Sequence, residues 1–104
     1  MKGVRILTEQ RHFEEGSVVR HFKYYQLSTP LQNIRCKEYT ILAHAIDTET
    51  GANMVVYKEL APTRRVFVRD AESFYSEVDH NKYPHSAQRY RFELLDPQLD
   101  STVS

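Results

Sequence analysis

The middle of the chain shows the clearest pattern, in which apolar and polar residues alternate on both sides of a polar segment. The run "YTILAHAI" covers residues 39–46, and the run "MVVYKEL" covers residues 54–60. Alternation with a period of two is typical of a strand whose side chains point to opposite faces of a sheet. In the first run, the residues expected on one face are Tyr39, Ile41, Ala43 and Ala45. The segment between the runs, "DTETGAN", is rich in turn-forming residues, so the sequence predicts a β-hairpin.

Shorter runs of β-branched and aromatic residues predict three further strands. They are "SVVRHF" at 17–22, "RVFVR" at 65–69 and "RYRFELL" at 89–95. Two helical turns are expected between the strands, one near residues 31–34 and one in "DAESFY". In the second turn, the Asp70 carboxylate can accept the free backbone N–H groups of the first residues and so cap the turn. This turn is expected to place Phe74 on the core.

These elements predict a mostly-β fold, namely a small antiparallel SH3-like β-barrel or sandwich with one or two short helical turns. The length of 104 residues suits one domain. We expect a single β domain over residues 16–95, in which residues 24–36 form an inserted loop. Residues 1–15 are expected to form an N-terminal extension, and residues 96–104 a flexible polar tail.

Charge and cysteine content narrow the function classes. Lys and Arg together number 14, as do Asp and Glu, so no net charge attracts nucleic acid or an anionic membrane. The one cysteine, Cys36, excludes an internal disulfide and fits a reducing compartment. No apolar run approaches the ~18 residues of a membrane-spanning helix, and the N-terminus lacks the apolar stretch of a signal peptide. We therefore expect a soluble cytoplasmic protein that does not associate with membranes.

Four segments of the chain stand out together: "GSVVRHFK", "IDTETGANMVVYKEL", "VFVRDAESFYSEVDHNKYP" and "QRYRFE". In order and spacing they resemble a family of small bacterial proteins, the domain of unknown function family 1653. The resemblance covers most of the chain, roughly residues 16–93. It implies a compact, mostly-β, intracellular bacterial domain, and it implies no activity, ligand or catalytic residue.

The chain departs from the family's pattern at several positions. Asp47 stands where the family has the histidine of a His-Thr-Glu-Thr block, and "LAPT" at 60–63 replaces Leu-Tyr-Gly-Asp. The Arg-Pro of the family is Arg69 followed by Asp70 here. Residues 24–36 look like an insertion that only some members have. The family's histidine at position 47 argues against a metal site that depends on a carboxylate there.

The acids of "DTET" are candidates for a cation site or for acid–base chemistry. The oxygens of Asp47 and Glu49 suit calcium, but the segment lacks the regular carboxylates, central glycine and terminal Glu of a calcium loop. Glycoside hydrolysis needs two carboxyl groups across a sugar cleft, and nothing in the sequence builds such a cleft around Asp47, Glu49 or Glu59. The pattern favours a hairpin turn, in which Asp47 or Thr48 bonds its own backbone and Gly51 or Asn53 takes a positive φ.

The five histidines show no spacing typical of metal ligands on a helix. His80 and His85 would need Cys36 or Asp79, which are distant in sequence, to hold zinc, so loop histidines exposed to solvent are the favoured interpretation. Cys36 lacks a neighbouring histidine that would make it a nucleophile. We therefore predict no catalytic residue, no metal site and no cofactor.

Arg69 and His21 are the charged or titratable residues with the clearest binding potential. Arg69 follows an apolar strand and precedes a capped turn, and its planar fork can bind a carboxylate or a phosphate. The alternative is an internal ion pair of Arg69 with Glu49 or Glu77. His21 lies in "RHFK", and its alternative role is a sheet-edge histidine bonded to a backbone carbonyl. A pocket lined by Arg69, Tyr57 and His21 would indicate a site.

Three functions compete. The leading hypothesis is a non-catalytic module that binds protein or peptide through an exposed strand edge or an aromatic-lined groove. The second is a nucleic-acid-binding barrel that uses Arg64, Arg65, Arg89 and Arg91 with neighbouring aromatic residues. The third is a hydrolase that uses Asp47, Glu49 or His21. The candidate binding residues are Arg69, Tyr57, Glu49, Thr50, His21, Phe67 and Tyr90.

Overall fold

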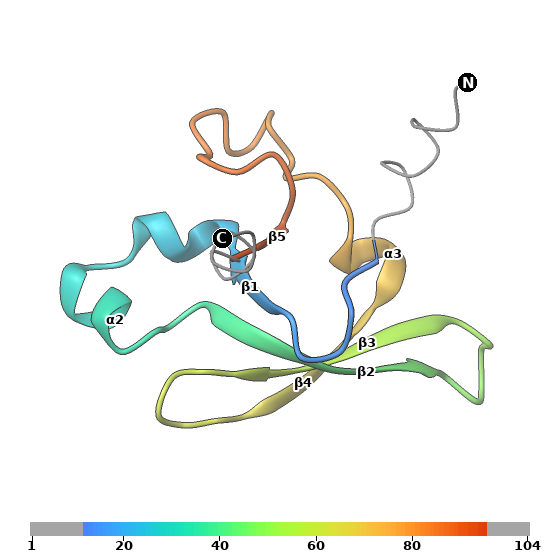
Figure 1. The fold of residues 1–104 in the computed structure, drawn as a ribbon. Coiled ribbons are helices and arrows are strands. Elements are labelled where there is room, and N and C mark those ends of the chain that lie inside the picture. The colour runs from blue at the N-terminus through green and yellow to red at the C-terminus, as the bar shows by residue number, and fades with distance from the viewer. Residues whose placement is uncertain (1–11, 96–104) are drawn as a thin grey trace, which may run out of the picture.

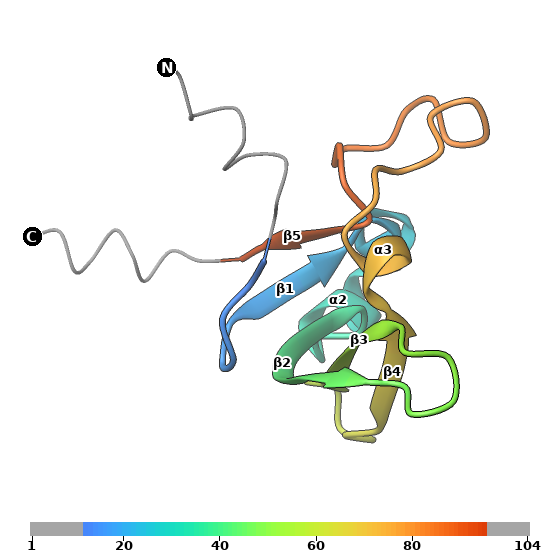
Figure 2. The ribbon, with the colours of Figure 1, turned by 90° about the vertical axis from the view of Figure 1, so that its right-hand side faces the viewer.

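One antiparallel sheet organises the molecule. The computed structural model describes residues 12–95, and within this range the strands follow the order β4-β3-β2-β1-β5. The elements in chain order are β1 (Val18–His21), η1 (Phe22–Gln26), α2 (Thr29–Asn33), β2 (Glu38–Ile46), β3 (Asn53–Glu59), β4 (Val66–Asp70), α3 (Ala71–Phe74) and β5 (Phe92–Leu94). Figures 1 and 2 show α3 and the long connection from α3 to β5 on one side of the β2-β3-β4 part of the sheet.

The mostly-β class is confirmed, and the closed barrel is not. β4 and β5 end the strand order at opposite sides and do not pair with each other among residues 12–95, so the described sheet stays open. The predictions for residues 1–11 and 96–104 lie outside the described residues. Phe13 belongs to the segment predicted as an N-terminal extension. It is buried in the core, and its backbone N–H donates to the Tyr75 hydroxyl oxygen at 3.0 Å.

The predicted strands at 17–22, 39–46, 54–60 and 65–69 are confirmed, with ends that shift by at most one residue. The last run, 89–95, forms a strand only over Phe92–Leu94. Its first half is held differently, because the backbone N–H groups of Arg89 and Tyr90 both donate to Glu93 Oε2, at 2.9 and 3.0 Å. Tyr90 forms an isolated bridge with Glu77 instead of extending the ladder.

A bulge in β2 reverses the predicted alternation. Ile41 pairs with Tyr57, but Ala43 pairs with Val56, so Leu42 is the extra residue. Beyond the bulge, His44 lies opposite the buried Val55, on the core face of the sheet. The prediction that Ala43 and Ala45 share a face with Tyr39 and Ile41 is therefore wrong.

The polar turn and the capped helical turn follow the prediction. In the turn between β2 and β3, Asp47 Oδ1 accepts the Glu49 N–H at 2.9 Å, and Gly51 has φ +78°. Asp70 Oδ2 accepts the Ser73 N–H at 3.1 Å and caps α3, which places Phe74 in the core with no exposed surface. The expected turn near residues 31–34 is α2, whereas η1 in the same insertion was not predicted.

The core is aromatic and lies on the face of the sheet that α3 covers. Its cluster of buried residues is Phe13, Val19, Tyr39, Ile41, Val55, Tyr57, Phe74 and Phe92. Phe74 and Phe92 stack with ring centroids 4.0 Å apart and planes 7° apart. This pair joins α3 to β5. Residues 75–91 connect these two elements.

Glu59 holds the turn between β3 and β4. It is 6% exposed, and its Oε2 accepts from both the Nε and the backbone N–H of Arg65 at 2.8 Å and from the Thr63 hydroxyl. The Arg65 guanidinium is the main cause that lowers the pKa of Glu59 to about 2. Because its folded pKa is depressed, the ionised carboxylate stabilises the fold fully above its unfolded value near 4.5 and loses this effect as the pH falls towards 2.

We therefore expect Glu59→Gln to lower the free energy of unfolding by about 1–2 kcal/mol at pH 7, since a charged acceptor of several hydrogen bonds is lost. Urea denaturation at pH 7, 4 and 2.5 measures this. The difference from the parent protein should shrink as the pH falls. Glu72→Gln, at an exposed position of α3, is the matched control. A pH-independent difference would show that the carboxylate charge does not stabilise the turn.

Candidate functional site

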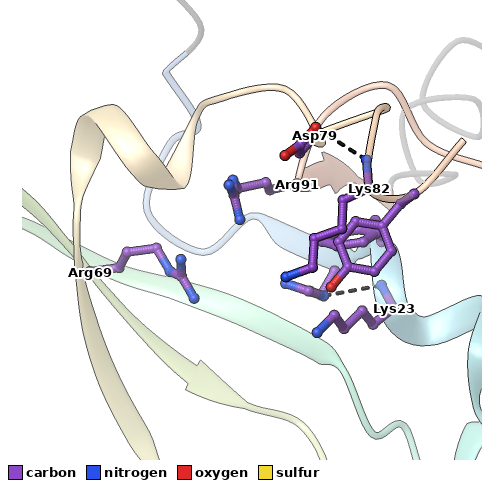
Figure 3. A pocket seen from close by; sticks show the side chains of 8 residues that line it. Lys23, Arg69, Asp79, Lys82 and Arg91 are labelled. Carbon is purple, nitrogen blue, oxygen red and sulfur yellow. Dashed lines mark hydrogen bonds between the residues drawn. The ribbon is translucent and has the colours of Figure 1, made fainter. Parts of the chain in front are cut away.

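A cavity of about 320 Å³ lies where the β1–η1 junction, β4 and the connection from α3 to β5 meet. The residues that line it are His21, Phe22, Lys23, Arg69, Asp79, Lys82, Tyr83 and Arg91. Figure 3 shows the labelled cationic side chains reaching this space from separate segments of the chain. The site is therefore assembled by the tertiary fold and not by one local motif.

Arg69 projects into the cavity from β4. Its Cα lies opposite the buried Val55, which places its side chain on the core face of the sheet. Its Nε donates to the Tyr57 hydroxyl at 3.5 Å and its Nη1 to Ser73 Oγ at 3.3 Å. The guanidinium carbon lies 5.7 Å from the centre of the Phe92 ring. The alternative of an ion pair with Glu49 or Glu77 is wrong, because Arg69 is held by two hydroxyl groups.

Arg91 faces the same space from the segment before β5. Its Nε donates to Ser76 Oγ at 2.8 Å and its backbone N–H to the Ser76 carbonyl at 3.0 Å. In Figure 3 its guanidinium and that of Arg69 extend towards the region between them. Neutral hydroxyl groups thus orient both arginines and leave their charges uncompensated.

His21 is a neutral hydrogen-bond donor at this site. Its Nδ1 accepts the Lys23 N–H at 3.1 Å and caps η1, so the alternative of a bond from His21 to a backbone carbonyl is wrong. Burial is the main cause that lowers the pKa of His21 to about 3, and the charges of Lys37 and Arg69 add to it. Because Nδ1 is an acceptor, the neutral ring carries its proton on Nε2. Among residues 12–95, no hydrogen bond occupies this Nε2–H group.

Two lysines stand beside Tyr83 on another wall of the cavity. The ammonium nitrogens of Lys23 and Lys82 lie 5.4 and 5.5 Å from the centre of the Tyr83 ring. The Lys23 ammonium beside the phenol is the main cause that lowers the pKa of Tyr83. The Tyr83 ring packs edge-on against Phe22, with centroids 5.0 Å apart. The Tyr83 ring therefore lies beside both lysine side chains of the lining.

The cavity carries a net positive charge. Its lining includes four cations and one carboxylate, Asp79, so its formal charge is +3 with neutral His21. The Asp79 carboxylate accepts the backbone N–H groups of Asn81 and Lys82, at 3.0 and 3.3 Å.

The ion pairs of the described region lie outside the cavity. In residues 12–95 the ion pairs are Arg20–Glu38, Arg35–Glu38, Arg65–Glu59 and Arg89–Glu77, and none includes a cation of the cavity. An anion that enters the cavity therefore finds cations without a carboxylate partner in this part of the chain.

The structure brings together only part of the predicted set. His21 and Arg69 line the cavity. Tyr57 is outside the lining, and its hydroxyl accepts a hydrogen bond from Arg69. The other predicted residues do not line the cavity. Phe67 packs on Tyr57, Tyr90 forms a β-bridge with Glu77, and Glu49 and Thr50 lie in the turn after β2.

Sequence reasoning missed Lys23, Lys82 and Tyr83 as site residues, and it assigned Arg91 to a nucleic-acid surface. Their cationic and aromatic character was visible in "RHFK", "NKYP" and "RYRF". What brings them together is contact between segments far apart in the sequence.

Residues 12–95 contain neither a metal-binding cluster of side chains nor a helix that could cross a membrane. Within residues 12–95, no group of three or more His, Cys, Asp and Glu side chains is arranged to hold a metal ion. In the same range, no helix has the length and apolar character needed to cross a membrane.

The family model described as "Protein of unknown function (DUF1653)" matches residues 10–94. The chain belongs to DUF1653. The resemblance seen in the sequence is thus confirmed at the level of the family, whose description assigns no function. No curated protein and no solved structure shows a significant match to the chain. All eight lining residues of this DUF1653 chain come from the segments "GSVVRHFK", "VFVRDAESFYSEVDHNKYP" and "QRYRFE".

Proposed function

We propose that the protein is a binding module that takes up an anionic group of its ligand in the cavity between β1, β4 and the connection to β5. One observation carries this proposal. Lys23, Arg69, Lys82 and Arg91 converge on a single cavity, and none of them forms an ion pair with an acid of residues 12–95. Unpaired cations that face one another repel, so an anion between them gains Coulomb energy at several contacts.

The positions of the candidate acids favour binding over hydrolysis. Asp47 and Glu49 belong to the turn after β2 and do not line the cavity that contains His21. Glu59 is engaged by Arg65 at the other end of β3. The Asp79 carboxylate caps its own turn. The predicted acid–base sets are therefore dispersed, which supports a non-catalytic role.

The arginines of the nucleic-acid hypothesis are also dispersed. Arg65 is paired with Glu59 and Arg89 with Glu77, and of the four arginines only Arg91 lines the cavity. A phosphodiester backbone is bound by a row of cations that follows the strand. The paired arginines supply no such row, so the anion-binding cavity has the better support. A peptide or protein partner and a cytoplasmic location stay predictions.

Titration with inorganic phosphate tests the proposal, with amide signals followed by ¹H–¹⁵N NMR at constant ionic strength. Signals of residues around Lys23, Arg69, Lys82 and Arg91 should shift and saturate. Lys82→Glu should weaken binding by roughly tenfold or more, because it changes the charge of the lining by two units. Lys58→Glu is the matched control, since Lys58 lies outside the cavity on β3 and should stay within about twofold of the parent. Shifts that never saturate, or equal binding by Lys82→Glu and the parent, would refute the proposal.

A further inference from the structure

We propose that the anionic group bound in this cavity is the terminal phosphate monoester of a small molecule. This inference rests on the proposed function and goes further, because it selects a phosphate monoester over a carboxylate and over a phosphodiester. It follows from three features of the cavity: its formal charge, the arrangement of its hydrogen-bond donors and its size.

The charge of the cavity suits a dianion. The lining has a formal charge of +3, from four cations and Asp79. A carboxylate or a phosphodiester brings one negative charge and leaves most of this excess unbalanced. A phosphate monoester carries about −1.5 to −2 at pH 7. The monoester therefore gains the largest Coulomb stabilisation from the same set of side chains.

The donors surround the space from different elements. Arg69 is held by Tyr57 and Ser73, and Arg91 is held by Ser76, so the guanidinium groups are oriented before a ligand arrives. His21 adds an Nε2–H donor whose direction is fixed by the bond of Nδ1 to the Lys23 N–H. Guanidinium groups suit phosphate oxygens, and donors from several sides match three terminal oxygens better than two oxygens in a plane.

The size and surroundings of the cavity favour a small ligand. Its volume of about 320 Å³ is at the lower end of the range for ligand pockets. The arginines Arg20, Arg35, Arg65 and Arg89, which lie outside it, are all paired with glutamates. Within residues 12–95 they therefore offer no unpaired track along which a nucleic-acid chain would continue. Phe22 and Tyr83 give the cavity an apolar wall against which the body of a small ligand can pack.

Three small probes separate the possible anions: methyl phosphate, dimethyl phosphate and acetate. Isothermal titration calorimetry at pH 7.5 and constant ionic strength should show methyl phosphate binding at least tenfold more tightly than the other two. Equal affinity for the three probes, within about threefold, would overturn the monoester assignment and leave the proposed function standing. Failure of all three probes and of inorganic phosphate to bind would refute both the monoester assignment and the proposed function.

The pH dependence supplies an independent readout. The second pKa of a phosphate monoester is near 6, so at pH 5 only about one tenth of it is the dianion. The affinity for methyl phosphate should therefore fall roughly tenfold between pH 7.5 and pH 5. Dimethyl phosphate carries one charge at both pH values, so its binding reports any change in the protein itself. A fall that is the same for both probes would contradict recognition of the dianion.

Variants at His21 separate recognition from folding. His21→Asn retains a side-chain oxygen that can accept the Lys23 N–H and cap η1, but it removes the Nε2–H donor. The variant should stay folded, with a lower thermal transition because the ring contacts with Phe22 and Phe92 are lost, and it should bind methyl phosphate about three- to tenfold more weakly. Unchanged affinity in a folded His21→Asn protein would show that the histidine takes no part in phosphate recognition and would overturn the donor arrangement.

Two larger probes test the size of the ligand. A phosphoserine hexapeptide and a 5′-phosphorylated trinucleotide carry the same monoester on a larger body. Each is expected to bind within about tenfold of methyl phosphate, since the cavity offers contacts to the phosphate and its nearest atoms. Much tighter binding of either probe, lost when its phosphate is removed, would overturn the assignment to a small molecule and identify the class of macromolecule.

Discussion

Replacing Phe74 by alanine is expected to lower the free energy of unfolding by about 3–5 kcal/mol, the cost typical of a buried Phe→Ala change. The Phe74 side chain has no exposed surface. Its ring stacks on Phe92 with centroids 4.0 Å apart, and its centroid lies 5.2 Å from that of the Tyr57 ring. No other residue of the four-residue helix α3 is buried, so Phe74 is its main anchor to the sheet. Because small domains are stable by about 5–15 kcal/mol, this one substitution removes a large part of the total.

Urea denaturation followed by circular dichroism measures the effect, with Val68→Ala as the control. Val68 lies on β4 with 59% of its surface exposed, so its truncation should change the free energy of unfolding by about 0.5 kcal/mol or less. A loss below about 1.5 kcal/mol in Phe74→Ala would mean that α3 is not anchored through this ring. The affinity of the cavity for an anion should fall as well, since the Phe92 ring that stacks on Phe74 also lies under the Arg69 guanidinium.

The hairpin of β2 and β3 was predictable because its signals are local. Alternation sets the strands, and the side-chain bond of Asp47 and the positive φ of Gly51 set the turn between them. The cap of α3 is local for the same reason, since Asp70 bonds a residue only three positions away. Such features depend on a few neighbouring residues, which a single sequence displays directly.

The bulge at Leu42 and the short β5 could not be predicted, because tertiary contacts decide them. Leu42 is an ordinary strand former, and only pairing with β3 makes it the extra residue. The predicted strand at 89–95 has good β-formers, yet Glu93 accepts the N–H groups of Arg89 and Tyr90 and turns the backbone out of the ladder. Propensity was overridden here by the Glu93 side chain and by residues 76–78, whose backbone exchanges hydrogen bonds with Arg89 and Arg91.

The candidate site divides in the same way. Arg69 was recognisable because it stands between an apolar strand and a helix cap, where its side chain is restricted to one face of the sheet. Lys82 lies in the polar run "DHNK", a pattern also typical of solvated loops, and Arg91 stands between Tyr90 and Phe92 in a run predicted as a strand. Their role depends on the path of the 75–91 connection, which brings them over β1 and β4 (Figure 3). The path of this connection cannot be predicted from a single sequence, because contacts with distant segments determine it.

Replacing Arg69 by methionine is expected to lower the affinity for methyl phosphate by about 10- to 100-fold, since a charged hydrogen-bond donor contributes about 1.5–3 kcal/mol. Methionine retains an unbranched apolar stem over the Phe92 ring but removes the charge and the fork. Arg69→Lys tests the geometry: it keeps the charge, yet one ammonium cannot reproduce the planar fork that contacts Tyr57 and Ser73. Its affinity should fall between those of the parent and the methionine variant.

Stability provides the decisive contrast for these Arg69 variants. Arg69 faces Lys23 and Arg91 without an ion-pair partner among residues 12–95, so removal of its charge relieves repulsion while it loses two long hydrogen bonds. We therefore expect the urea midpoint of Arg69→Met to stay close to that of the parent while phosphate binding is lost. Arg64→Met, in the exposed turn before β4 and outside the cavity, should leave both properties unchanged. Loss of stability together with binding would instead mean that Arg69 serves the packing of β4, because a binding cation can be removed without unfolding the sheet that carries it.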